Sequence, residues 1–255
     1  AHRDLHSFPT RRSSDLFRDL QRVLPKIVYD LEVLNIRRKQ NVNGFYPLLN
    51  ADVHGYCDSY DYSFIDNTDT AQGSVFDCRA DKDCIPDEPL YVSFDFGTTQ
   101  NCLVVAQWIR PAEEFRLIRN FFVENETLSV LVQRFIDHYQ PKPYKFVYLY
   151  GGSDGNRRND AASRDSYFDD VRAQLSKAGW QVQLRAELYE AHHMDKYQFW
   201  FKFLSGDYPG VPAFRINMNN AMETFFSMDN APILPQEFKK DKSSERKKDQ
   251  PRWKA

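Results

Sequence analysis

Strand-forming patterns dominate the middle of the chain. The nearly continuous apolar run Leu90–Phe96 predicts a strand, and Cys102–Trp108 and Phe115–Val123 predict two more. Gly97–Thr99 separates the first two strands, and Pro111–Glu114 separates the second from the third. Because these turns are short, the three strands are expected to form a meander.

Apolar residues at helical spacing follow the third strand. In Glu126–Tyr139 they recur every three or four positions, which predicts an amphipathic helix with one buried face. Phe146–Tyr150 is short and almost entirely apolar, as is typical of a strand buried on both faces. Ser166–Ala178 predicts a second helix, with Ser166 and Asp169 together suited to its N-terminal cap and Gly179 to its C-terminal cap.

Four further elements complete the pattern. Val182–Leu184 predicts a strand, Ala191–Leu204 a helix, Ala213–Asn217 a strand and Asn220–Met228 a helix. The order strand, strand, strand, helix, strand, helix, strand resembles that of the ribonuclease-H-like fold. The expected fold class is therefore α/β, with a mixed sheet flanked by helices.

The first part of the chain lacks this regularity. His2–Leu16 resembles one translated frame of a short-read sequencing adapter, and no apolar core or cleavage site of a targeting peptide follows it. We therefore expect residues 1–16 to be non-native and the natural gene to begin further upstream. Asn50–Pro89 is rich in Asp, Ser, Tyr and Asn, which predicts a linker or an excursion with little regular structure.

Composition limits the choice of function. A chain of 255 residues with 42% hydrophobic and 15% aromatic residues can bury one good core. No apolar run approaches the roughly 18 residues of a membrane helix, so we expect a soluble protein without a membrane partner. The net charge of −2 gives no global nucleic-acid signal, so any DNA contact must come from a local basic patch.

Cysteine and histidine give weak signals. The four cysteines are Cys57, Cys78, Cys84 and Cys102. They are too few and too unevenly spaced for a disulfide scaffold, so reduced thiols are expected. Cys78 and Cys84 could form half of a zinc site, but no second pair has ligand spacing. His138, His192 and His193 could suggest a metal cluster, although adjacent histidines on a helix point to different faces.

One acidic residue lies in the first predicted strand. Asp95 follows apolar neighbours, and a buried carboxylate without a partner costs several kcal/mol. A divalent cation shared with a second carboxylate is one such partner, because two-metal nucleases hold cations about 3.5 to 4 Å apart in this way. The alternative is a turn cap, in which Asp95 accepts a hydrogen bond from the amide of Gly97 or Thr98.

A second carboxylate is expected at the end of the next buried strand. Tyr150–Asn156 is a glycine-rich turn in which Asp154 is the one carboxylate, and glycines let a backbone approach metal and phosphate closely. Asn156, Arg157 and Arg158 could hold a DNA phosphate there. The alternative is an ordinary surface turn, where Asp-Gly is common.

The last residues are strongly basic. Lys239–Lys254 contains eight Lys and Arg against three Asp and Glu, with Trp253 available for stacking. Such a segment can follow a phosphate backbone without reading sequence, and Lys240, Lys242 and Arg246 are the residues that we expect to contact DNA. A solvated tail is the alternative.

Several of these motifs together resemble the nuclease domain of large terminase subunits, the DNA-packaging motors of tailed phages. They are Phe94–Gly97, Val104–Gln107, Phe122–Asn125, Tyr150–Asn156, Ser163–Phe168, Ala178–Trp180 and Lys240–Arg246. Further upstream, Glu32, Asn35, Phe45–Pro47 and His54–Gly55 resemble the segment that joins the ATPase motor to the nuclease. The resemblance implies that residues 17–89 are the end of the motor and a linker, and residues 90–255 a C-terminally truncated nuclease domain.

The resemblance also implies an activity. Members of this family cut concatemeric double-stranded DNA with Mg²⁺ or Mn²⁺ held by three acids, in the host cytoplasm, alongside a portal and a small terminase subunit. Asp95 matches the first acid. The second usually follows Tyr-Gly directly, where this chain has Gly152, so either Asp154 substitutes for it or a point change or read error has removed it. The third is expected beyond Ala255, and no Gly-x-x-x-x-Gly-Lys-Ser/Thr loop of an ATPase is present.

Two other functions remain open. Asp95–Thr99 resembles the first phosphate loop of actin-like and Hsp70-like ATPases, and Gly151–Gly155 could be a second such loop. Those proteins need two such domains, so tight ATP binding without DNA would be required to favour them. The other function is a non-catalytic DNA-binding module, indicated by salt-dependent DNA binding without Mn²⁺-stimulated cutting.

Overall fold

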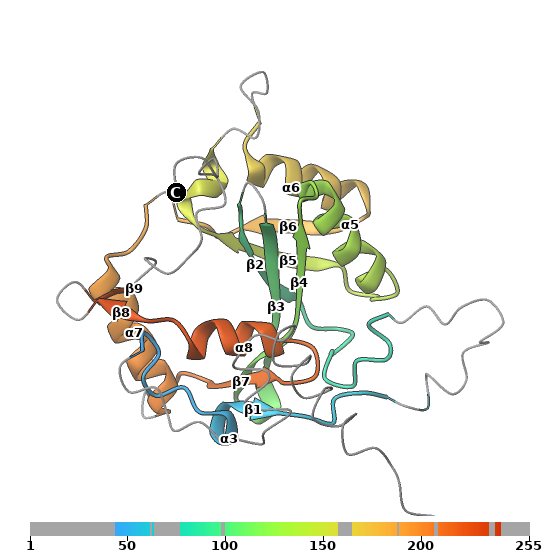
Figure 1. Cartoon of the computed structure of the whole chain (residues 1–255). Helices are drawn as coiled ribbons and strands as arrows, with labels where there is room; N and C mark the ends of the chain where they lie inside the picture. Colours follow the sequence, from blue (N-terminus) through green and yellow to red (C-terminus); the bar gives the residue numbers. More distant parts are fainter. Residues whose placement is uncertain are drawn as a thin grey trace, which may run out of the picture. The chain divides into compact units, whose positions relative to one another are not determined.

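The computed structural model describes residues 44–61, 63, 77–97, 100–157, 165–187, 189–206, 209–234 and 238–240. They belong to one compact unit, Val42–Ala255, and are drawn in colour in Figure 1. The other unit, Ala1–Asn41, lies outside the described residues, and with it the segment expected to be non-native.

A mixed sheet with the strand order β1-β7-β4-β3-β2-β5-β6 forms the centre of this unit. Its strands are β1 (Gly55–Tyr56), β2 (Leu90–Asp95), β3 (Gln100–Ile109), β4 (Glu114–Glu124), β5 (Phe146–Gly151), β6 (Gln181–Leu184) and β7 (Ala213–Asn217). The β2–β3 and β3–β4 pairs are antiparallel, and the β2–β5, β5–β6, β4–β7 and β1–β7 pairs are parallel. The predicted meander is therefore confirmed.

Helices cover the sheet. The described ones are α3 (Ala51–His54), α5 (Leu128–Tyr139), α6 (Tyr167–Lys177), α7 (His193–Ser205) and α8 (Met222–Asp229). α5 packs against β3, β4 and α6, whereas α7 and α8 pack against β7 (Figure 1). None of the described helices is long and apolar enough to cross a membrane.

The ends of α6 follow the predicted capping chemistry. The Ser166 side chain accepts a hydrogen bond from the Asp169 amide, and the Asp169 carboxylate accepts one from the Ser166 amide, so the two residues form a capping box. At the other end, Gly179 has a φ of +86°, a backbone conformation that favours glycine. These contacts fix where α6 begins, beside the turn that follows β5.

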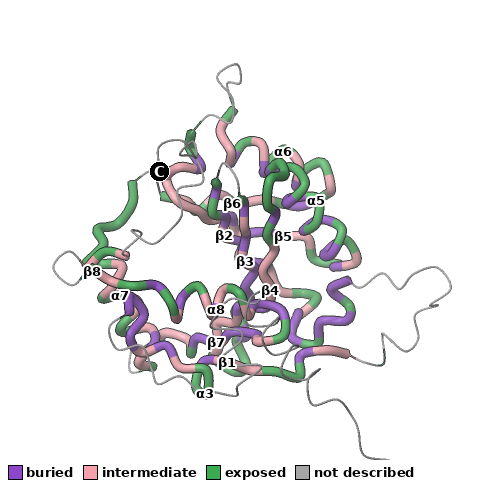
Figure 2. Tube along the Cα trace, viewed as in Figure 1, coloured by how far each residue is buried: buried purple, intermediate pink, exposed green. Residues whose placement is uncertain are grey.

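Two hydrophobic clusters lie against the sheet. Side chains alternate along β2, so Leu90, Val92 and Phe94 join the first cluster with the apolar face of α5. Tyr91, between them, packs with the second cluster, to which α7 and α8 contribute. Figure 2 shows the resulting buried positions along the central strands. Ser93 and then Asp95 follow on the Tyr91 side of the strand.

Five neighbouring strands of the sheet lie in the order β4-β3-β2-β5-β6. Numbered from β2 by sequence, this is the order 3-2-1-4-5 of the ribonuclease-H-like fold, with α5 after the third strand and α6 after the fourth. The predicted α/β fold with a mixed sheet flanked by helices is thus confirmed. Sequence patterns did not indicate that β1 would extend this sheet. The described parts of Asn50–Pro89 contain little regular structure, as expected, yet Ala80, Cys78 and Cys84 within them are buried.

A short pair of strands lies near α7. β8 (Ile233–Leu234) pairs antiparallel with β9 (Lys239–Lys240). This pairing brings Lys239 and Lys240 beside α7, from which Lys196 also projects into a shared cavity.

Candidate functional site

Asp95 is the last residue of β2, and its side chain is exposed. The premise that this carboxylate is buried is therefore wrong, because the strand ends at Asp95 instead of Phe96. The Gly97 amide donates to the Asn101 side chain at 3.2 Å, so it does not make the expected turn cap with Asp95. Within the described part of the chain, no hydrogen bond or ion pair occupies the Asp95 carboxylate.

The environment of Cys102 reports where the Asp95 carboxylate lies. Cys102 is opposite Asp95 in the β2–β3 register. Burial raises the pKa of the Cys102 thiol to about 11, and the negative charge of Asp95 adds to this rise. The Asp95 carboxylate is therefore close enough to Cys102, near the beginning of β3, to disfavour the negative charge of a thiolate there.

The register of β2 and β5 brings Asp95 beside Gly152. Ser93 pairs with Tyr150 and Phe94 with Gly151, and both strands run in the same direction. The next position in this register is Asp95 with Gly152, at the carboxyl ends of the two strands. Because adjacent strands lie about 4.8 Å apart and side chains alternate between faces, positions 95 and 152 are neighbours on one face.

Asp154 fills the space that a side chain at position 152 would enter. A Cβ atom added to Gly152 would lie 2.5 Å from Asp154 Oδ1. Asp154 belongs to the 3-10 helix η4 (Ser153–Asn156), where its Oδ1 accepts a hydrogen bond from the Gly155 amide at 3.1 Å. The turn thus folds the Asp154 carboxylate back over Gly152, beside the end of β2.

Close packing holds this turn against the first hydrophobic cluster. Gly155 is buried, and a Cβ atom there would collide with the rings of Phe168 and Phe96. These two rings pack edge to face with centroids 5.3 Å apart. A glycine at position 155 therefore lets η4 sit directly on the aromatic side chains that follow β2 and begin α6.

Glu190 is a second carboxylate near Gly152, and no sequence pattern pointed to it. Its Oε1 lies 3.7 Å from the same added Cβ atom and 3.4 Å from the Ser153 hydroxyl. Its Oε2 accepts a hydrogen bond from Lys196 Nζ at 2.7 Å. This contact with Lys196 lowers the pKa of Glu190.

The turn of residues 151–156, with the Asp154 carboxylate, is called the acidic turn below. Lys196, which binds Glu190 beside this turn, also lines a basic cavity of about 230 Å³. Its lining comprises Phe45, Tyr46, Glu190, His193, Lys196, Trp200, Lys239 and Lys240. Lys240, which was predicted to contact DNA, thus lies in the cavity that Glu190 joins to the acidic turn. Lys196 was not predicted, because it comes from a helix whose aromatic residues dominate its pattern, and His193 was considered only as a possible metal ligand.

The other expected contact residues are partly described. Asn156 and Arg157 are exposed at the end of η4, where the Arg157 amide donates to the Asp154 carbonyl oxygen at 2.9 Å. Arg158, Lys242 and Arg246 lie outside the described residues, as do Thr98 and Thr99 of the expected ATP phosphate loop.

The described His, Cys, Asp and Glu side chains form no group of three that could hold a metal ion. Cys78 and Cys84 are buried next to each other, and a hydrogen bond between their thiols lowers the pKa of Cys78. His138 Nε2 lies 2.7 Å from Asp81, which also binds Arg119 at 2.6 Å. His138 therefore belongs to a buried polar contact.

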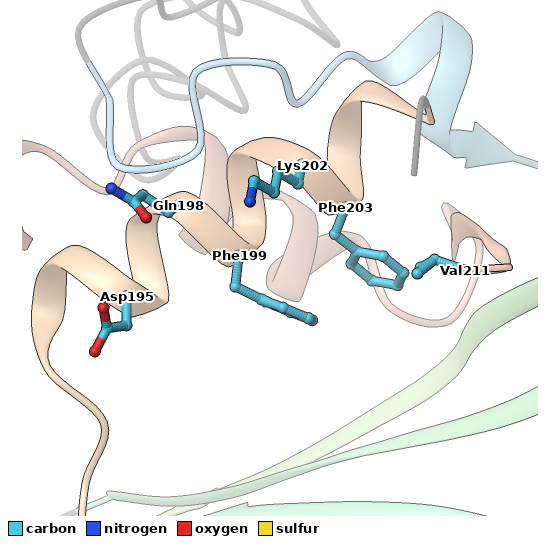
Figure 3. A pocket seen from close by; sticks show the side chains of 6 residues that line it. All are labelled: Asp195, Gln198, Phe199, Lys202, Phe203 and Val211. Carbon is cyan, nitrogen blue, oxygen red and sulfur yellow. The ribbon is translucent and has the colours of Figure 1, made fainter. Parts of the chain in front are cut away.

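A separate cavity of about 360 Å³ lies along α7. Figure 3 shows its lining side chains, Asp195, Gln198, Phe199, Lys202, Phe203 and Val211. Phe199 is 56% exposed there, although Tyr197, Trp200 and Phe203 of the same aromatic run pack against the second hydrophobic cluster. The expected helix core is thus present on one face of α7, and no residue of the acidic turn lines this cavity.

The chain is similar in structure to phage large terminases. The large terminase of a thermophilic bacteriophage is 13% identical over 89% of this chain and 47% of its own, with a TM-score of 0.48. The nuclease domain of the bacteriophage SPP1 large terminase, solved with bound Mn, is 10% identical over 71% of this chain and 80% of its own, with a TM-score of 0.36.

A third structure shows the same likeness. The bacteriophage P22 large terminase nuclease domain is 13% identical over 56% of this chain and 70% of its own, with a TM-score of 0.38. No family model matches the sequence, and the curated proteins gave no significant match. The chain spans about half the length of the first of these terminases. The assignment of the fold rests on the strand order described above.

Proposed function

We propose that this chain carries the nuclease domain of a phage large terminase subunit, a metal-dependent endonuclease that cuts concatemeric double-stranded DNA in the host cytoplasm. In the whole protein, its partners would be the portal and the small terminase subunit. The observation that supports this proposal is that two carboxylates follow neighbouring parallel strands at the same edge of the sheet. Asp95 ends β2, and Asp154 folds over Gly152 at the end of β5.

The donor set at these strand ends fits a hard divalent cation. Carboxylate oxygens are the ligands that Mg²⁺ and Mn²⁺ prefer, and Asp95 is exposed and without a protein partner among the described residues. When bound, such cations supply Lewis-acid stabilisation of the charge that develops on the phosphodiester. In this proposal, Asp95 and Asp154 would bind the divalent cations.

Basic and polar side chains around the two acids would bind the DNA backbone. Asn156 and Arg157 are exposed at the end of η4, and Lys240 lines the adjoining basic cavity. Arginine and lysine contacts to phosphate position a duplex without reading its sequence, which fits cutting with little sequence preference. Arg158, Lys242 and Arg246 extend this assignment along the sequence.

Nicking of supercoiled plasmid by the 255-residue chain with Mn²⁺ tests the proposal. Asp95→Ala should abolish the Mn²⁺-dependent nicking, because one of two carboxylates that hold the cation is lost. Asp137→Ala is the matched control, since Asp137 is exposed on α5 and outside the proposed site. Nicking by Asp95→Ala at the rate of the control would remove Asp95 from the mechanism.

A non-catalytic DNA-binding module is the second candidate. The observation that favours it is the basic cavity lined by Lys196, Lys239 and Lys240. In that case the chain would bind DNA with strong salt dependence, and Mn²⁺ would stimulate no nicking. The same plasmid experiment, with DNA binding measured in parallel, separates the two functions.

A further inference from the structure

The basic cavity forms where three segments that are far apart in sequence meet. α7 contributes His193 and Lys196, the β8–β9 pair contributes Lys239 and Lys240, and the segment before α3 contributes Tyr46. At about 230 Å³, the cavity is smaller than the roughly 300–1,000 Å³ of sites for drug-sized ligands. Its size therefore suits a small group instead of a whole cofactor.

The charges of the lining favour an anion. Among the described lining residues, three lysine side chains are present against the one carboxylate of Glu190. Glu190 already binds Lys196, with Oε2 2.7 Å from Nζ. The excess of positive charge on a concave surface concentrates anions, because field lines converge where low-dielectric walls exclude water.

Aromatic rings hold one of these cations in place. Lys240 Nζ lies 4.8 Å from the ring centroid of Tyr46 and 5.5 Å from that of Phe45. Both rings are buried, so the ammonium group rests on an apolar wall. Burial raises the pKa of Tyr46 to about 12, although nearby Lys196 acts in the opposite direction. A preorganised ammonium loses little conformational freedom when an anion binds.

Glu190 connects this cavity to the acidic turn. One of its oxygens lies 3.4 Å from the Ser153 hydroxyl of η4, and the other binds Lys196 inside the cavity. The Glu190 side chain alone therefore spans the gap between the acidic turn and the cavity. A DNA strand carries one phosphate for about every 3.4 Å of helix rise, so a strand at the turn has further phosphates within this reach.

We propose that the cavity lined by His193, Lys196, Lys239 and Lys240 binds one phosphate group of the DNA strand that lies at the acidic turn. This inference rests on the proposed function. The ligand chemistry is a phosphate anion, and its source is the phosphodiester backbone. Lys196 and Lys240 contact the same phosphate, one from α7 and the other from β9.

The salt dependence of DNA binding tests this proposal without any cleavage. Binding of a short duplex is measured in EDTA over a range of salt concentrations for the wild type, Lys196→Gln, Lys240→Gln and the double variant. Each single variant should lower the slope of log K against log salt by up to about one. Because both lysines bind the same phosphate, the double variant should lower it by about one and no more. Lys177→Gln, exposed at the end of α6, is the control and should keep the wild-type slope.

Three outcomes would overturn the proposal. An unchanged slope in the double variant would mean that the cavity contacts no DNA phosphate. A loss of about two in the double variant would mean two independent surface contacts. Calorimetric binding of inorganic phosphate that the double variant loses, without a change in DNA binding, would assign the cavity to a free anion.

The result also stands apart from that of the plasmid test. Mn²⁺-dependent nicking by the wild type with normal DNA binding by the double variant would reject the cavity and keep the nuclease. If the double variant shows the lowered salt slope but the wild type does not nick DNA, the phosphate contact is supported and the nuclease activity is rejected.

Discussion

At the residue scale, the turn after β5 carries its carboxylate at Asp154. Gly152 carries no side chain, and the Asp154 carboxylate occupies the space beside it, 2.5 Å from the place of a Cβ atom. Gly152 has a φ of −69°, which any L-residue can adopt. A side chain added at position 152 would collide with the carboxylate of Asp154, which is the end of a flexible side chain. Position 152 can therefore accept an acid when the Asp154 side chain moves or is removed.

An exchange of the two residues tests whether Asp154 acts in this way. Asp154→Gly should lose Mn²⁺-dependent nicking by at least about tenfold, as expected for loss of a metal ligand. The double variant Gly152→Asp/Asp154→Gly should recover most of it, because it returns a carboxylate to the same face beside Asp95. Full activity of Asp154→Gly alone would show that the cleavage needs no carboxylate in this turn.

The residue scale also shows what the sequence could reveal of the site. Asp95 was proposed because it is an acid within a predicted apolar strand, and Asp154 because it is the one carboxylate in the turn after the next buried strand. Glu190 and Lys196 were missed, because neither follows such a run and their proximity to Gly152 depends on the path between β6 and α7. Contacts between residues far apart in sequence leave no local pattern.

At the element scale, local patterns predicted the strands and helices that have a strong period. The alternation along β2 and the spacing along α5 both match their burial. β1 was missed because it has two residues, and its pairing with β7 joins positions about 160 residues apart in sequence. Register between such distant segments is set by packing, which no short window of sequence contains.

Asp83 is one of the residues that attach the segment before β2 to the sheet. Its Oδ2 accepts hydrogen bonds from the Tyr56 hydroxyl of β1 at 2.5 Å and from the Asn217 amide of β7 at 2.7 Å. Oδ1 is buried, and no described group donates a hydrogen bond to it. Burial raises the pKa of this carboxyl, despite the two donors.

Asp83→Asn should therefore stabilise the fold at neutral pH. The amide oxygen can keep both hydrogen bonds, while the variant removes a buried negative charge whose desolvation costs on the order of 1–3 kcal/mol. Because the folded pKa lies above the unfolded value, this cost is complete above the folded pKa, declines as pH falls below it, and is lost below the unfolded pKa of about 3.9. Urea unfolding at pH 8 and at about pH 4 should show a larger gain at pH 8. An equal or larger gain at the lower pH would contradict this account.

At the scale of the whole described unit, acidic and basic side chains meet at one end of the central strands. Because the overall charge of −2 gives no sign of DNA binding, any DNA contact requires a local basic patch. The cavity around Lys196, Lys239 and Lys240 provides such a patch next to the carboxylates of the turn. This juxtaposition comes from the fold, since α7 and β9 are separated by β7 and α8 in sequence.

The central claim is that Asp95 and Asp154 together hold a divalent cation, and the affinity for Mn²⁺ measures this most directly. Free Mn²⁺ in equilibrium with the chain can be quantified by electron paramagnetic resonance. The wild type and Asp137→Ala should bind Mn²⁺ with the same affinity, and Asp95→Ala and Asp154→Ala should each bind it at least about tenfold more weakly. Equal Mn²⁺ affinity in all four proteins would contradict the account.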